Sequence, residues 1–173
     1  MPISPYIDGY VLPESFDEAC IDGTLAQVPY MIGYTLNDSG NMGDQIREFA
    51  LNREEMGGKA YTYQFARPLP TDGRPNVLQG AFHSSDLWFV FKSLEHCWRP
   101  WTQGDWDLSE RMLTAWSNFA KYGDPNGPDG GEWTPYTAAT PQFMVWKLDE
   151  ADAEASAMGE PLVPPRPNFG PRP

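Results

Sequence analysis

Two side chains in this sequence have the types and positions that acid–base catalysis needs. His83 lies in a Gly-containing loop, 80–86, and Asp38 lies in the polar loop 35–40. An imidazole titrates near neutral pH, which makes His83 the first candidate for a general base. A carboxylate bonded to that imidazole can fix its tautomer and stabilise the imidazolium formed in a reaction. An acid after one strand and a histidine after a later strand is the order of the last two members of a Ser–acid–His triad.

Each candidate also has a structural interpretation. A lone histidine more often satisfies local hydrogen bonds, and an Asp in a turn usually bonds to nearby backbone. The second histidine, His96, falls near the end of a predicted helix, where a structural role is the better interpretation. Spacing alone leaves both interpretations of His83 and Asp38 open.

Other residue types that could carry chemistry lack the necessary spacing. The possible metal ligands are two histidines and two cysteines, Cys20 and Cys97, but adjacent His96 and Cys97 are poorly spaced and no Cys-x-x-Cys or His-x-x-x-His occurs. No glycine-rich phosphate loop follows a predicted strand. The sequence therefore predicts no metal site and no cofactor.

The elements that would position His83 and Asp38 belong to the α/β class. The apolar run 28–34 predicts a strand buried on both faces, as in a parallel sheet. Residues 43–56 predict a helix that ends at Gly57 and Gly58, and the alternating residues 60–65 predict the next strand. Strand, helix and strand in this order indicate a βαβ unit, with both candidate residues in loops that follow strands.

The remaining patterns divide the chain into one domain, 1–148, and an acidic, then Pro-rich, extended tail, 149–173. The N-terminal 27 residues predict irregular structure. Asp107, with Glu110 three residues later, predicts the start of a helix over 108–122. The other expected elements are a loop over 68–80, a short helix from residue 87 and two strands, 133–137 and 143–148.

Composition excludes several functional classes. The chain has 173 residues, 24 of them acidic and 12 basic, so its formal charge is −12 and no basic run suits a nucleic-acid backbone. No stretch approaches the roughly 18 apolar residues of a membrane span. The first residues do not have the pattern of a signal peptide, so any targeting segment is expected upstream and the compartment stays open. Two cysteines make no disulfide framework, and a Cys20–Cys97 bridge is not expected.

Four stretches of the sequence resemble a known family. They are 6–13, 28–33, the histidine segment 80–87, and 116–136 with its Trp-Ser-Asn-Phe-Ala and Gly-Asp-Pro-Asn motifs. In type and order they resemble the C-terminal portion of the type-B carboxylesterases, the α/β-hydrolase family that includes cholinesterases and bacterial para-nitrobenzyl esterases. The resemblance implies the C-terminal part of an α/β-hydrolase fold, an incomplete sheet with flanking helices.

The resemblance implies a role for each candidate residue. His83 matches the catalytic histidine of the family, which accepts the proton of the nucleophile. Asp38 stands five residues after Gly33, where the family commonly has Glu. The substitution keeps the carboxylate and shortens its arm by one methylene group.

The sequence departs from the family by an absence. The Gly-x-Ser-x-Gly nucleophile motif does not occur, and Ser39, Ser84 and Ser85 lie outside any such pattern. We therefore expect a portion of a serine carboxylic ester hydrolase that is inactive alone, exposes apolar surface and needs a Ser-bearing N-terminal portion or chain. The expected substrate is a carboxylic ester, without a nucleic-acid or membrane partner. The alternatives are a non-catalytic binding module of the same fold and an inert, truncated remnant.

Overall fold

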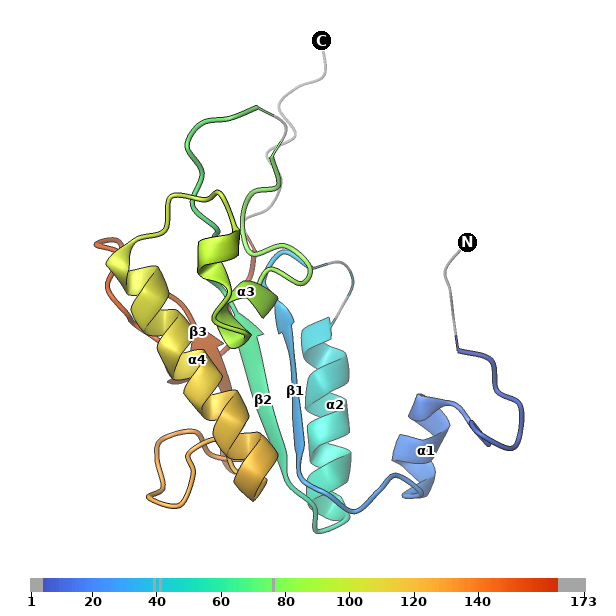
Figure 1. The fold of residues 1–173 in the computed structure, drawn as a ribbon. Coiled ribbons are helices and arrows are strands. Elements are labelled where there is room, and N and C mark those ends of the chain that lie inside the picture. Colours follow the sequence, from blue (N-terminus) through green and yellow to red (C-terminus); the bar gives the residue numbers. More distant parts are fainter. Residues whose placement is uncertain (1–4, 39, 41, 76, 165–173) are drawn as a thin grey trace.

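A four-stranded sheet lies between helices in the computed structural model, which describes residues 5–38, 40, 42–75 and 77–164. The strands are in the order β1-β2-β3-β4. Helix α2 (Met42–Glu55) covers one face of the sheet and α4 (Gln103–Tyr122) covers the other (Figure 1). The predicted α/β class, with an incomplete sheet and flanking helices, is confirmed.

The first half of the sheet is the predicted βαβ unit. Strand β1 (Tyr30–Thr35) and strand β2 (Ala60–Phe65) are parallel, with Tyr30 opposite Ala60 and Thr35 opposite Phe65. Helix α2 connects them and ends before Gly57, whose positive φ of 73° suits glycine. Both strands point their carboxyl ends toward the same edge of the sheet, the upper edge in Figure 1.

The second half of the sheet brings the C-terminal part of the chain to the core. Strand β3 (Phe143–Trp146) pairs with β2 and is parallel to it. Strand β4 (Ala157–Gly159) pairs with β3 and is antiparallel to it. Beyond β4, the Leu162 N–H donates to Gln64 Oε1 at 2.7 Å, and Gln64 Nε2 donates to the Leu162 carbonyl at 2.9 Å. The described part of the expected tail, up to 164, is therefore hydrogen-bonded to β2 near its carboxyl end; residues 165–173 lie outside the described residues.

Three predicted elements need correction. Residues 133–137 form no strand, because Pro135 lacks a backbone N–H and Asn126 binds both polar groups of the Trp133 backbone. Helix α4 begins at Gln103, not 108, because Thr102 and Asp105 form the capping box in place of Asp107 and Glu110.

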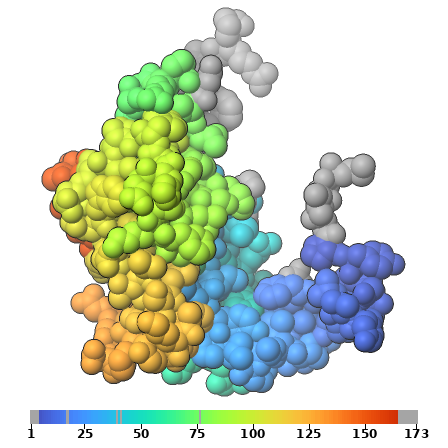
Figure 2. Space-filling model, viewed as in Figure 1, coloured from blue at the N-terminus to red at the C-terminus, as the bar shows by residue number. Residues whose placement is uncertain are grey.

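The N-terminal segment expected to be irregular contains a helix. Helix α1 (Phe16–Asp22) begins with a capping box of Ser15 and Glu18 and ends at Gly23, whose φ is 72°. In Figures 1 and 2 this segment projects from the rest of the molecule.

Two short helices precede α4 in the chain. They are α3 (Leu87–Val90) and the 3-10 helix η1 (Leu94–His96). Helix α3 packs against α4, where Ser109 Oγ donates to the Phe89 carbonyl at 2.8 Å. This contact fixes the segment that follows His83 on the core.

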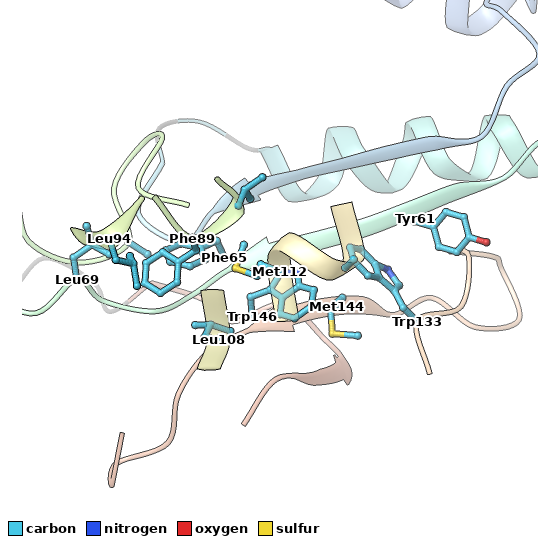
Figure 3. Close-up of a cluster of buried hydrophobic side chains, with 13 residues drawn as sticks. Tyr61, Phe65, Leu69, Phe89, Leu94, Leu108, Met112, Trp133, Met144 and Trp146 are labelled. Carbon is cyan, nitrogen blue, oxygen red and sulfur yellow. The ribbon is translucent and has the colours of Figure 1, made fainter. Parts of the chain in front are cut away.

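The core on the α4 side is rich in aromatic rings (Figure 3). The rings of Trp116, Trp133 and Trp146 lie against one another with centroids 5.6–6.2 Å apart. The ring of Tyr63 meets that of Trp116 at 4.9 Å. Burial of such rings supplies most of the driving force for packing α4 on the sheet.

The strand at one edge of the sheet, β1, has no partner on its outer side among the described residues. Its first five residues are only half-buried. Large apolar side chains elsewhere are exposed, among them Phe16, Ile21 and Phe91. The expected exposure of apolar surface is confirmed for the described chain.

Cys20 is buried beside α2, Cys97 follows η1, and the structure does not join them. Within the described ranges, no helix has the length and apolar character needed to cross a membrane.

Candidate active site

The structure brings Asp38 and His83 together although they are 45 positions apart in the sequence. The Nδ1 of His83 lies 2.9 Å from Asp38 Oδ2, which is hydrogen-bonding distance. Asp38 follows the carboxyl end of β1, and His83 lies in the loop segment that returns to the same edge of the sheet after β2. The carboxyl edge of a parallel sheet is where α/β proteins commonly present functional side chains.

Two hydrogen bonds between Asn37 and Ala81, here called the clamp, join the loop of Asp38 to the loop of His83. The Asn37 N–H donates to the Ala81 carbonyl at 2.9 Å, and the Ala81 N–H donates back to Asn37 Oδ1 at 2.8 Å. Asn37 directly precedes Asp38 in the sequence, and Ala81 lies two residues before His83. The clamp therefore sets the separation of the two loops independently of the Asp38–His83 bond itself.

Gly80 is required beside this clamp. Its φ is +77°, and a Cβ at this position would lie 2.4 Å from Asn37 Oδ1. Any other residue would both strain the backbone and push Asn37 away. Asn37 and Gly80 lie in the loop 35–40 and the segment 80–87 of the sequence analysis, but no local pattern predicts their contact, because it joins distant loops.

The bond to Asp38 determines how His83 can act. The hydrogen bond and the charge of Asp38 raise the pKa of His83 above its ordinary value. In the neutral imidazole, Nδ1 carries the hydrogen and donates it to the carboxylate, so the Nε2 lone pair is left to accept a proton. The His83 side chain is 80% exposed and that of Asp38 only 16%, so the ring extends from a partly buried carboxylate into solvent.

A second carboxylate, that of Asp86, is buried three residues after His83. Asp86 is at the N-terminus of α3, and the hydroxyl of Tyr63 donates to its Oδ2 at 3.3 Å. Burial raises the pKa of Asp86, and the negative charge of Asp86 adds a smaller upward contribution to the pKa of His83. Sequence reasoning did not single out Asp86; its position three residues after the histidine and directly before an apolar helix was the available signal.

No serine hydroxyl among the described residues is hydrogen-bonded to His83. Ser84 follows His83 with a φ of 66°, unusual for a residue other than glycine, and Ser85 is buried. Ser39 lies outside the described residues. The described chain thus has a carboxylate bonded to an imidazole, and none of its described serine hydroxyls is bonded to that imidazole.

The other sequence candidates lie elsewhere. His96 belongs to η1, and its exposed ring has Nε2 3.6 Å from Glu95 Oε1. In the part of the chain that the structure describes, no group of three or more His, Cys, Asp or Glu side chains could hold a metal ion.

Comparison with known proteins identifies the family. The sequence profile of the Carboxylesterase family matches residues 41–161. The acetylcholinesterase of Gallus gallus is 35% identical over 99 residues, which are 57% of this chain and 13% of that protein. The bile salt-activated lipase of Rattus norvegicus is 34% identical over 89 residues, or 50% of this chain and 14% of that protein.

A solved structure shares the fold. A thermophilic PNB esterase superposes on 90% of this chain with a TM-score of 0.65 at 16% identity, and the match covers 41% of the esterase. This chain therefore spans less than half of that esterase and less than a fifth of the two sequence relatives. On the match of the family profile to most of its length, the chain belongs to the carboxylesterase family.

Proposed function

We propose that this chain supplies the base and the orienting acid of a serine carboxylic ester hydrolase. The observation that carries the proposal is the 2.9 Å contact between His83 Nδ1 and Asp38 Oδ2 at the carboxyl edge of a parallel sheet. The nucleophilic serine and the oxyanion hole come, in this proposal, from a Ser-bearing N-terminal portion or chain. The family membership supports a carboxylic ester as the substrate class.

Each step of the reaction assigns a definite task to the pair. As the serine oxygen attacks the ester carbonyl, His83 Nε2 accepts its proton, and Asp38 stabilises the imidazolium. His83 then returns the proton to the leaving alcohol. In the second half-reaction His83 takes a proton from water, which attacks the acyl-enzyme, and gives it to the serine oxygen. Asp38 keeps Nδ1 protonated in the neutral imidazole, so Nε2 is the reacting atom throughout.

The outer edge of β1 supports a docking position for the Ser-bearing portion. The N–H groups of Tyr30 and Leu36 donate toward β2, at 2.9 and 2.8 Å, so those of alternate residues, such as Met31, face the outer edge. A parallel strand added there would lie about 4.8 Å from β1. Its carboxyl end would then reach the edge at which Asp38 and His83 lie.

The proposal is tested in a hybrid esterase. This chain replaces the matching part of the thermophilic PNB esterase, whose remaining part would, on this proposal, supply the nucleophile, and hydrolysis of para-nitrophenyl acetate is measured. We expect turnover that falls about 10⁴-fold or more in His83→Ala, because removal of one triad member disables the unit. His96→Ala is the matched control and should keep the unsubstituted rate.

Other outcomes would contradict the proposal. Equal losses in H83A and H96A, or a hybrid that folds by near-ultraviolet circular dichroism without turnover, would argue for a binding module or an inert remnant. Turnover by this chain alone that depends on His83 would contradict the external nucleophile.

A further inference from the structure

We propose a second site, for a small oxyanion, at the end of the sheet opposite His83. A cavity of about 420 Å³ lies there, between the start of β1, the turn before β2 and the C-terminal end of α4. Its lining includes Arg53, Lys59, Gln27 and Asp124. Nothing in the proposed ester chemistry uses these residues.

The central feature of this cavity is the buried guanidinium of Arg53. Arg53 is only 1% exposed, and no described carboxylate forms an ion pair with it. Nη2 donates to Gln27 Oε1 at 3.2 Å, whereas Nε and Nη1 have no acceptor among the described residues. A buried cation without an anionic partner is costly, because it has lost water and gained no opposite charge.

The surroundings hold the guanidinium in place without neutralising it. Its Cζ lies 5.1 Å from the centroid of the Tyr30 ring, a cation–π contact. On another side, a Cβ at Gly58 would lie 2.4 Å from Nη2, so only glycine leaves room for the guanidinium. Arg53 is in the last turn of α2, where helix carbonyls favour a cation, but none of them accepts from Nε or Nη1.

The one carboxylate of the lining is already occupied. Asp124 accepts from the Asn126 backbone and side chain, at 2.9 and 2.8 Å, and from the Tyr61 hydroxyl at 2.9 Å. Although burial acts to raise it, these bonds and the charge of Lys59 hold the pKa of Asp124 below its ordinary value. Asp124 is thus held by other donors and is not the counterion of Arg53.

These observations define the ligand class. A guanidinium binds carboxylates and phosphates through pairs of N–H groups, and its geometry suits a planar or tetrahedral oxyanion. Lys59, exposed at the mouth of the cavity, adds a second positive charge. Gln27 is exposed, and its uncharged amide oxygen is the acceptor that an entering anion would replace at Arg53 Nη2.

The test is a titration of the full chain followed by nuclear magnetic resonance. The probes are sodium phosphate and, separately, sodium acetate, with sodium chloride at equal ionic strength as reference. The ¹⁵N–¹H signals of the arginine Nε groups are recorded, and that of Arg53 is assigned with Arg53→Lys. We expect the Arg53 signal to move with a saturating response to at least one oxyanion, while that of Arg74 stays in place.

Matched variants locate the site. Lys59→Gln removes an exposed charge without disturbing the core, and it should weaken binding about fivefold. Lys147→Gln removes one charge outside this cavity and should leave the affinity unchanged. A response to acetate as well as phosphate points to a carboxylate as the physiological ligand, and a response to phosphate alone points to a phosphoryl group.

The proposal is overturned if the Arg53 signal stays in place with both oxyanions in the folded chain. It is equally overturned if chloride at the same ionic strength moves the signal as far, because screening then explains the change. Neither result depends on the ester hydrolase proposal, since the titration needs no turnover.

Discussion

His83 and Asp38 form a pair whose properties depend on their different exposure to solvent. The carboxylate is mostly covered and its position is fixed, whereas the imidazole extends into solvent. In the proposed function, Asp38 would therefore orient His83 while the imidazole stays accessible to a substrate and to an incoming nucleophile. At this scale the sequence predicted both residues correctly as neighbours of strand ends, while the catalytic roles stay a prediction.

Replacement of Asp38 by Asn should lower the pKa of His83 toward its ordinary value, because the hydrogen bond to a charged acceptor and its Coulomb attraction are both lost. The ¹H–¹³C imidazole signals of His83, followed against pH, measure the change. Glu95→Gln, which alters the neighbour of His96, is the control and should leave the His83 midpoint in place. An unchanged midpoint in D38N would show that another group perturbs His83.

The raised pKa also fixes the sign of two pH effects. A general base must be neutral, so turnover of the hybrid esterase should rise with pH through a midpoint above the ordinary histidine value, and D38N should lower that midpoint along with the rate.

The protonated pair stabilises the fold below the unfolded-state pKa of His83. That contribution is lost as pH rises through the folded-state pKa.

Asn37 is the residue whose replacement tests the clamp. Asn37→Ala removes the bond that Asn37 Oδ1 accepts from the Ala81 N–H, and the free energy of unfolding should fall by about 1 kcal/mol in urea titrations. In the hybrid esterase the rate should fall more than stability explains, because the two loops lose their register. A rate equal to that of the unsubstituted hybrid would show that the Asp38–His83 bond suffices to align the loops.

Among the elements, those with local sequence signals were predicted and those fixed by distant contacts were not. The alternating residues of β2 and the glycines after α2 are local signals, and both elements were predicted to within a residue or so. The start of α4 was predicted too late, because the sequence analysis assigned the capping box to Asp107 and Glu110, which lie inside the helix. Thr102 is the N-cap instead, and its partner in the capping box, Asp105, also accepts from Arg67, 38 residues earlier, at 2.8 Å.

The Asn37–Ala81 clamp and the Gln64–Leu162 bonds were missed for the same reason. They join residues 44 and 98 positions apart, and no periodicity in the sequence records such a contact. Helix α1 is different, because Ser15 and Glu18 were a readable local signal in a segment interpreted as irregular.

The outer edge of β1 leads to a prediction at the scale of elements. Met31→Pro removes an N–H that faces away from β2, so the sheet of this chain should survive while pairing with an added strand is blocked. We expect turnover of the hybrid esterase to fall at least tenfold in M31P. Met31→Ala is the control for loss of the side chain, and equal rates in M31P and M31A would exclude β1 as the docking edge.

At the scale of the whole molecule, the segment after β4 returns to β2, one of the two inner strands of the sheet. Gln64 is fully buried on β2 and exchanges two hydrogen bonds with Leu162. A chain that ends at Glu160 lacks Leu162, so the buried side-chain amide of Gln64 loses both of these hydrogen bonds. It should lose about 1–3 kcal/mol of stability in denaturant unfolding.

A chain that ends at Pro164 keeps Leu162 and is the control for this truncation; it should be more stable than the chain that ends at Glu160. Equal stability of the two truncated chains would mean that water replaces Leu162 at no cost. The predicted boundary at residue 148 stays untested as a domain boundary, but strand β4 and Leu162 show that residues beyond it contribute to the sheet.

The three tryptophans between α4 and the sheet have an optical consequence. Indole rings with centroids 5.6–6.2 Å apart couple their excited states and exchange excitation energy faster than they emit. The chain should therefore show a paired positive and negative band in its circular dichroism and low polarisation of its emission. Both signals report on the packing of α4 against β3. Circular dichroism and fluorescence polarisation can therefore distinguish a variant with a loosened core from one altered only at the outer edge of β1.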